Sequence, residues 1–187
     1  MGKIAIGVTG ASGSVYAMRL FDKLVKTSLN KADIAVVFSE QGEQVFRYEA
    51  GDAAFEAIPF QRYNNRDFFA PFASGSSLFD TFIIIPCSMG TLARIASGLA
   101  GNLISRAADV MLKERRRLIL VTRETPLNLI HIRNMEQVTE AGGIICPASP
   151  SFYSRPTTLE QAVDTVVDRV LSLVSIPVDT FRWSGNG

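Results

Sequence analysis

The sequence has few of the residues that build disulfide frameworks or metal sites. Its 187 residues include two cysteines, Cys87 and Cys146, and one histidine, His131. Two cysteines form at most one disulfide. Together with a single histidine they supply fewer Cys and His ligands than the four that a structural zinc site uses. We therefore expect two buried thiols, a structural role for His131 within a helix, and no metal site.

Other signals are missing as well. The chain carries no Gly-x-x-x-x-Gly-Lys motif, which excludes an ATP site of the P-loop class. Its formal net charge is +1, so the charge balance does not indicate a nucleic acid or an acidic membrane as partner. The densest apolar run, 82–87, is too short to span a bilayer, and the first residues do not read as an export leader. These features predict a cytoplasmic protein.

What the sequence does contain is an alternation of short apolar runs and amphipathic segments, with 47% hydrophobic residues overall. Buried strands are predicted at 3–8, 33–38, 81–85, 118–121 and 143–146. Helices are predicted at 14–25, 40–48, from 92, and at 102–114, 127–141 and 159–174. This alternation predicts an α/β fold: a single-domain, doubly wound (Rossmann- or flavodoxin-like) parallel sheet with helices on both faces. The domain would span 1–187, with a C-terminal tail from about 177.

Small and hydroxyl-bearing residues follow the predicted strands. They are Gly10, Ala11 and Ser12 after the first strand, Ser39 after the second, and Ser88, Gly90 and Thr91 after the third, and Tyr153 follows the last strand. Arg123 and Glu124 follow the fourth. Ligands of parallel sheets bind outside the carboxyl ends of the strands, and a helix start can hold an anion. Glycine in such a turn can equally be steric, and Arg beside Glu can be a surface ion pair. The residues alone indicate a phosphorylated, flavin-like ligand and leave these alternatives open.

Residues 59–77 look like a loop, yet they contain Phe60, Tyr63, Phe68, Phe69 and Phe72. A surface loop seldom keeps so many aromatic side chains. We therefore expect this segment to pack on a neighbouring subunit or to wall a pocket.

Several segments together resemble the UbiX-type flavin prenyltransferases, which are related to the homo-oligomeric flavin-containing Cys decarboxylase superfamily. The segments are GVTGASGSVYAMRL, FASGSS, PCSMGTLARIASG, NLISRAADVMLKERRRLILVTRETPL, IHIRNM and PSFYSRP. The resemblance runs from about Lys3 to Pro177. It implies an enzyme that joins the dimethylallyl group of dimethylallyl monophosphate to reduced FMN at N5 and C6, without a metal. It also implies homo-oligomers, typically dodecamers with sites between subunits, and a UbiD-type decarboxylase as recipient of the prenylated FMN, for example in ubiquinone biosynthesis.

The resemblance also assigns residues. It implies FMN binding by Gly10, Ala11, Ser12, Ser39, Ser88, Met89, Gly90, Thr91 and Arg123. It implies binding of the prenyl phosphate by Arg106, Lys113, Arg123, Tyr153 and Arg169. It implies proton handling by Ser12, Glu49 and Glu124. Arginine, lysine and tyrosine suit this chemistry because preorganised donors must hold the leaving phosphate. Aromatic faces can steady an allylic cation, a role that suits Phe68 and Trp183.

Two other functions are weighed against this one. An FMN-dependent cysteine decarboxylase of the same superfamily would need a catalytic histidine and a Pro-x-Met-Asn motif, whereas this chain has Pro147-Ala148-Ser149-Pro150. A non-catalytic FMN carrier for a decarboxylase would not need a second phosphate site. The prenyltransferase is the favoured function.

Overall fold

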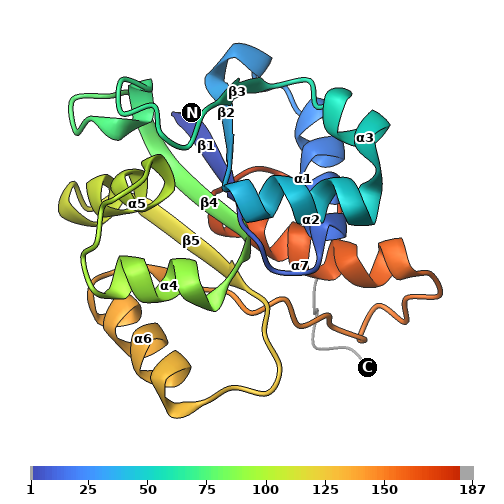
Figure 1. Ribbon diagram of the computed structural model, residues 1–187. Coiled ribbons are helices and arrows are strands. Elements are labelled where there is room, and N and C mark those ends of the chain that lie inside the picture. Colours follow the sequence, from blue (N-terminus) through green and yellow to red (C-terminus); the bar gives the residue numbers. More distant parts are fainter. Residues whose placement is uncertain (1, 182–187) are drawn as a thin grey trace.

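The computed structural model describes residues 2–181, and a parallel sheet organises them (Figure 1). The strands are β1 (Lys3–Val8), β2 (Ile34–Phe38), β3 (Gln61–Tyr63), β4 (Phe79–Cys87), β5 (Arg117–Thr122) and β6 (Ile144–Ile145). They lie side by side in the order β3-β2-β1-β4-β5-β6, and every neighbouring pair is parallel. From β1 the chain first adds β2 and β3 on one side, and then adds β4, β5 and β6 on the other side of β1. The order in which strands are added therefore reverses between β1 and β4. This is the switch point at which doubly wound sheets bind ligands.

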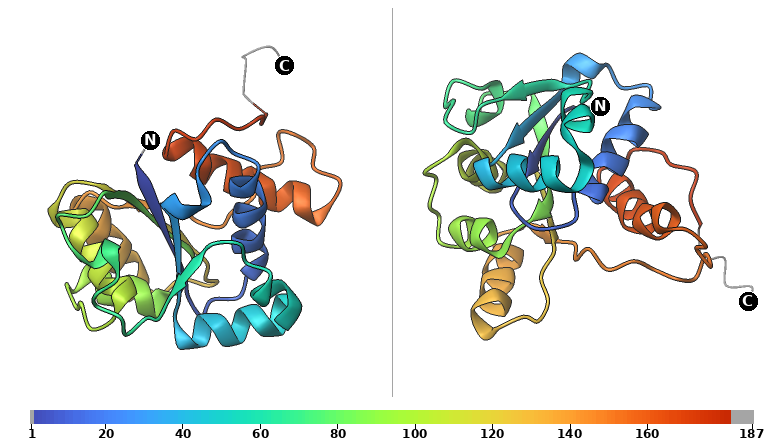
Figure 2. Two further views of the ribbon diagram at one scale, coloured as in Figure 1. Left: turned by 90° about the horizontal axis from the view of Figure 1, so that it is seen from above. Right: turned by 45° about the vertical axis from the view of Figure 1, so that its right-hand side comes forward.

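Helices cover both faces of the sheet (Figure 2). They are α1 (Ser14–Val25), α2 (Glu40–Ala50), α3 (Asp52–Glu56), α4 (Met89–Ala96), α5 (Leu103–Lys113), α6 (Leu129–Glu140) and α7 (Leu159–Leu173). Two 3₁₀ turns, Lys31–Asp33 and Pro71–Ala73, complete the described elements. Figure 2 shows α1 and α7 on one face and α4, α5 and α6 on the other.

The strands are apolar throughout because each face of the sheet meets its own core. Successive strand side chains point to opposite faces. Ile4 and Ile6 accordingly join the core beneath α1 and α7, whereas Ala5 joins the core beneath α4 and α5. A helix packed on each face removes both sets of side chains from water, which explains the near-continuous hydrophobic runs of the sequence.

Helix α2 runs across the ends of β1 and β2 and not along them (Figure 1). Its start is capped by Ser39, whose Oγ accepts a hydrogen bond of 2.9 Å from the Gly42 amide. Gly42 lies against β1: a Cβ there would be 2.3 Å from the Val8 carbonyl oxygen. This close packing on β1 holds α2 in the position that places its last turn next to the start of α1.

The predicted fold class is confirmed, with one strand that the sequence did not reveal. β3 has three residues, none of them buried, so it lacks the apolar run that identified the other strands. The aromatic segment around it is also more internal than expected. Phe60 and Phe72 are core residues, and Tyr63 packs edge-on against Phe72 at 5.3 Å. Only Phe68 and Phe69 are exposed, at 47% and 99%.

The two cysteines are free thiols inside the fold, and the histidine caps a helix. Cys87 is buried, Cys146 is half-buried, and both thiols are free. His131 completes a capping box with Asn128 at the start of α6, accepting a 3.4 Å hydrogen bond on Nδ1. Within residues 2–181, none of the helices combines the length and apolarity needed to cross a bilayer. Trp183 lies outside the described residues.

Candidate active site

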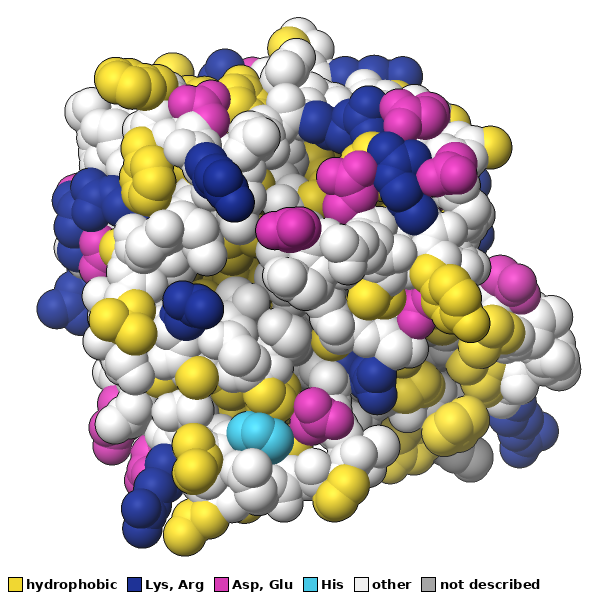
Figure 3. Space-filling model, viewed as in Figure 1, with side chains coloured by type: hydrophobic (Ala, Val, Ile, Leu, Met, Phe, Trp, Pro, Cys, Tyr) yellow, Lys and Arg dark blue, Asp and Glu magenta, His cyan; other side chains and the backbone are white. Residues whose placement is uncertain are grey.

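A cleft of about 970 Å³ opens above the carboxyl ends of the strands, between α2 and α4. Gly10, Ser39 and Ser88, which follow β1, β2 and β4, all line it. Charged side chains gather beside it over α2 and α3 (Figure 3). The residues that the sequence analysis selected after β1, β2 and β4 therefore meet in one cleft.

Thr9 fixes the geometry at the switch point. Its side chain is buried, and Oγ1 donates to the Pro86 carbonyl at 2.8 Å while accepting from the Ser88 amide at 2.8 Å. These two bonds tie the end of β1 to the end of β4. Sequence reasoning did not select Thr9, although a hydroxyl directly after the first strand was a visible signal.

Two helix starts face the cleft with hydroxyl caps. Ser39 caps α2, and Ser88 caps α4 by accepting from the Thr91 amide at 3.3 Å. The Ser88 hydroxyl also hydrogen-bonds the Thr91 hydroxyl at 3.1 Å. Amide groups and hydroxyls at a helix start favour an anion. Beside them, a Cβ on Gly90 would meet nothing within 4 Å, so this side of α4 is open.

The start of α1 is already occupied by a carboxylate from the chain itself. Glu49, near the end of α2, accepts hydrogen bonds from the amides of Gly13 at 3.0 Å and Ser14 at 2.7 Å. Burial opposes its ionisation, but hydrogen bonds from the Ser12 hydroxyl and these amides prevail and lower the pKa of Glu49. Gly13 has φ +119°, so its turn needs glycine for a steric reason. The steric explanation of this turn is correct for Gly13.

Arg123 reaches from the end of β5 across β4 to the loop before α1. Its Nε donates to the Ser12 carbonyl at 2.8 Å. Glu124 accepts from the Thr125 amide at 3.0 Å and forms no ion pair with Arg123 in the described structure. The surface ion-pair alternative is therefore wrong.

Tyr16 is a second residue that the sequence did not select. It donates to the Ala148 carbonyl at 3.3 Å, joining α1 to the loop after β6. Burial raises the pKa of Tyr16 and outweighs the nearby Arg123 charge, which lowers it. The hydroxyl thus stays protonated and able to donate beside Arg123.

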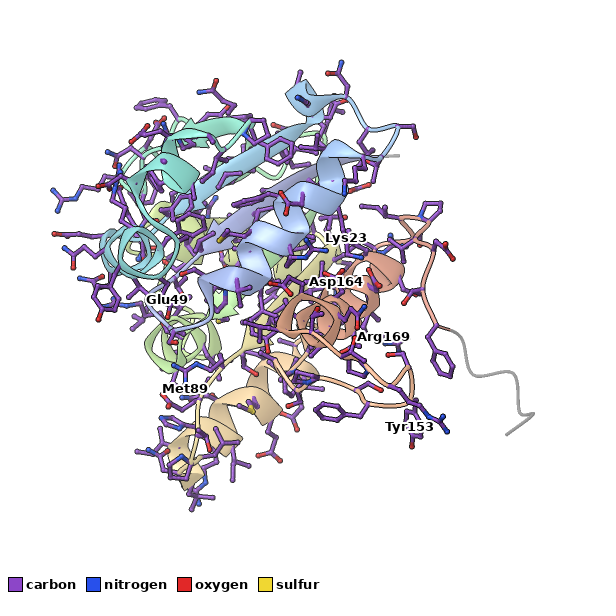
Figure 4. The ribbon with its side chains drawn as sticks, turned by 90° about the vertical axis from the view of Figure 1, so that its right-hand side faces the viewer. Lys23, Glu49, Met89, Tyr153, Asp164 and Arg169 are labelled. Atoms are coloured by element: carbon purple, nitrogen blue, oxygen red, sulfur yellow. The ribbon has the colours of Figure 1, made fainter. Side chains whose placement is uncertain are left out.

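The expected prenyl-phosphate residues do not join this group within one chain. Tyr153 and Arg169 lie apart from Glu49 and Met89, on the side of α7 (Figure 4). Both are exposed, and Arg169 lines a separate cavity of about 570 Å³ between α7 and the segment after it.

Arg106 and Lys113 belong to α5 and also have local partners. Arg106 donates to the Ala73 carbonyl at 3.1 Å and pairs with Asp109 at 3.0 Å, while Lys113 pairs with Glu114. Lys113 precedes the start of β5, whereas Arg123 follows the end of that strand. A single chain therefore holds the flavin-side residues together and the phosphate-side residues apart from them.

A doubly wound parallel sheet with hydroxyl-capped helix starts at its switch point is the architecture in which nucleotides and flavins bind. Residues 2–175 match the family model described as Flavoprotein. Flavin prenyltransferase UbiX of Thermoplasma acidophilum is 42% identical over 184 residues, covering 97% of this chain and 99% of that protein. The chain belongs to the flavin prenyltransferase family and is a transferase of that kind.

Solved structures agree in fold and sequence. AnUbiX (PadA1), crystallised with FMN and dimethylallyl pyrophosphate, matches with a TM-score of 0.91 at 40% identity, over 100% of this chain and 99% of that chain. A dodecameric FMN-dependent UbiX-like decarboxylase from Escherichia coli O157:H7 matches with a TM-score of 0.91 at 36% identity, over 98% and 100%. The FMN-dependent cysteine decarboxylase TvaF, at 13% identity and a TM-score of 0.62, shares the fold alone.

Proposed function

We propose that this enzyme transfers the dimethylallyl group of dimethylallyl monophosphate to reduced FMN, at N5 and C6, and delivers the prenylated FMN to a UbiD-type decarboxylase in the cytoplasm. The observation that carries the proposal is the cleft at the switch point, where Gly10, Ser39, Ser88, Gly90 and Thr91 line one continuous surface. The side chains of Ala11 and Met89 are buried. Met89 would therefore contribute its backbone amide to FMN binding. The Ala11 amide donates to the Thr9 carbonyl at 2.9 Å, so Ala11 would contribute a backbone that the flavin can approach closely.

The acid–base chemistry fits the group around the start of α1. Glu49 is held by the Ser12 hydroxyl and two backbone amides, so it is ionised and fixed in position. A positioned carboxylate in contact with a hydroxyl can accept and return a proton through that hydroxyl. We assign Ser12 and Glu49 to proton handling at the flavin, and the exposed Glu124 to proton handling near the leaving phosphate.

A second copy of the chain would complete the site. Departure of phosphate needs donors that are already in place, because negative charge develops on the leaving oxygen. Tyr153, Arg169, Lys113 and Arg106 are suitable donors, but in one chain Tyr153 and Arg169 lie apart from Glu49, and Lys113 lies at the other end of β5 from Arg123. We propose that they act across subunit contacts in a homo-oligomer, which the dodecameric neighbour supports as a general arrangement.

The test is to incubate the purified protein anaerobically with reduced FMN and dimethylallyl monophosphate and to weigh the extracted flavin by mass spectrometry. A gain of one five-carbon prenyl unit is expected, and it should be lost in Glu124→Gln and Tyr153→Phe. Glu136→Gln and Tyr48→Phe are matched controls, because both residues are exposed and neither lines the cleft. Unmodified flavin despite tight FMN binding would refute the transferase and favour a carrier or a cysteine decarboxylase.

A complementation experiment tests whether the site is shared. Glu49→Gln and Tyr153→Phe subunits should each be inactive alone. When the two are coexpressed, some subunit contacts would combine the intact Tyr153 of one copy with the intact Glu49 of another. Recovered prenylation is the expected result, and no recovery in a mixed oligomer of verified composition would contradict the shared site.

The cysteine decarboxylase alternative is less well supported. Its catalytic histidine has no counterpart here, because His131 serves the capping box of α6. The carrier alternative gives no role to a second set of phosphate donors such as Lys113 and Arg169.

A further inference from the structure

Among the residues that the structure describes, two arginines of the cleft have no partner of opposite charge. Arg47 pairs with Glu43, Asp52 and Glu56 at 2.8–2.9 Å, and Arg62 pairs with Glu56 at 3.0 Å. Arg66 and Arg94 also line the cleft, but within residues 2–181 neither side chain forms an ion pair or a hydrogen bond. Both are exposed.

The remaining charges of the lining do not cancel these two. Glu43 and Glu56 are engaged by Arg47 and Arg62, which also lie over the Phe55 ring at 3.9 and 4.5 Å. Glu40, in the first turn of α2, is the lining carboxylate that lacks an arginine partner among the described residues. The cleft thus keeps an excess of unpaired positive charge near α4.

Arg94 can extend toward the start of α4. It lies four residues after Gly90 on α4, so the two positions are neighbours on the helix surface. The Cα–Cβ bond of a helical residue tilts toward the helix start, and a long side chain follows it. Since Gly90 has no side chain and open space beside it, the guanidinium of Arg94 can extend over Gly90 toward the hydroxyls of Ser88 and Thr91.

Arg66 approaches from the other wall on a fixed loop. Its amide donates to the Asn64 side chain at 2.8 Å. The neighbouring Asn65 accepts from the Leu103 amide at 2.8 Å through its carbonyl and from the Ile104 amide at 3.1 Å through Oδ1. The loop after β3 is therefore anchored to the start of α5, which holds the Cα of Arg66 in place.

We propose that Arg94, with Arg66 opposite, binds the terminal phosphate of FMN and makes this site select a flavin monophosphate over the uncharged flavin. This inference rests on the proposed use of the cleft for FMN. A phosphate monoester is close to dianionic at neutral pH, and the guanidinium fork presents paired donors to its oxygens. Ser88 and Thr91 supply hydroxyls to the same group, and Arg66 and Arg94 supply the charge.

The experiment compares two ligands on three proteins. Dissociation constants for FMN and for riboflavin are measured by quenching of flavin fluorescence for the full-length wild type, Arg94→Gln and Arg133→Gln. Riboflavin has the same ring and ribityl chain but lacks the phosphate. Arg133 is a matched control, being an exposed arginine on α6 that does not line the cleft.

Arg94→Gln should weaken FMN binding by about tenfold, the size of a hydrogen bond to a charged group, and leave riboflavin binding unchanged. Arg66→Gln should act in the same direction, and the salt dependence of FMN binding should become shallower in both. Arg133→Gln should change neither ligand.

An equal loss for both ligands would show that Arg94 only supports the fold, and no loss for either would place the phosphate elsewhere; both results overturn the proposal. The prenyl mass gain at saturating FMN is read separately, so failure of this assignment and failure of the transferase are distinguishable.

Discussion

Removing the carboxylate of Asp164 should measurably loosen the contact between α1 and α7. Arg19 on α1 donates to Asp164 on α7 through Nε at 2.8 Å and through a second nitrogen at 2.7 Å. Lys23, one turn along α1, lies 3.3 Å from Asp164 and 2.7 Å from Asp168 (Figure 4). The Asp164 side chain is 20% exposed, so solvent only partly screens these contacts.

The expected size follows from these contacts. Hydrogen bonds to charged groups each contribute about 1.5–3 kcal/mol net. In Asp164→Asn, Arg19 keeps Asp22 at 3.6 Å and Lys23 keeps Asp168, so neither cation is left alone. We therefore expect a loss of about 2 kcal/mol in the free energy of unfolding. For a chain of this length that is a fall of about 4–8 °C in Tm.

The assay is thermal and denaturant unfolding at one fixed protein concentration, because oligomer stability depends on concentration. Arg19→Gln, Asp164→Asn and the double variant form a cycle that isolates their coupling. Asp22→Asn is the control: its side chain is 58% exposed, and such a surface pair contributes less than about 1 kcal/mol.

The pH dependence gives the decisive result. Burial raises the pKa of Asp164, but Arg19 and Lys23 outweigh it and hold that pKa below its ordinary value. The carboxylate's contribution is therefore complete above its unfolded-state pKa of about 3.9. It is lost as the pH falls through the lower, folded-state pKa. The difference between wild type and Asp164→Asn should shrink in acid. An equal difference at neutral pH and in acid would refute the electrostatic explanation.

Three further predictions concern the positions that shape the site. Thr9→Val should lower the free energy of unfolding by about 1–3 kcal/mol, because the Ser88 amide and the Pro86 carbonyl lose their partner. Thr9→Ser keeps the hydroxyl and should be nearly neutral. Denaturant midpoints of the two variants test this difference, and equal midpoints would contradict it. Gly42→Ala should destabilise by about 3 kcal/mol or more through its clash with Val8, while Gly90→Ala, with open space around it, should not destabilise; similar losses in both would contradict the packing argument. Burial raises the pKa of the Cys87 thiol far above its usual range, so a thiol reagent should modify Cys87 only after unfolding, and rapid modification of the native protein would disprove this.

The sequence was sufficient for the fold class because its signals are local. Strands buried on both faces must be apolar throughout, so β1, β2, β4 and β5 are visible as hydrophobic runs. Helix periodicity and the small residues after each strand then place the switch point. β3 escaped notice for the same reason, since an exposed edge strand of three residues needs no apolar run.

Tertiary structure alone decided which of these residues meet. Glu49 and the start of α1 are more than thirty residues apart in sequence, and only the crosswise path of α2 brings the carboxylate to those amides. Arg123 likewise turns to Ser12 and not to the adjacent Glu124, because the order of β1, β4 and β5 places the α1 loop within its reach. Local sequence pattern specifies strands, helices and turns, since their causes lie within a few residues. The partners of a charged side chain depend on strand order and helix direction, which arise only when the whole chain has packed.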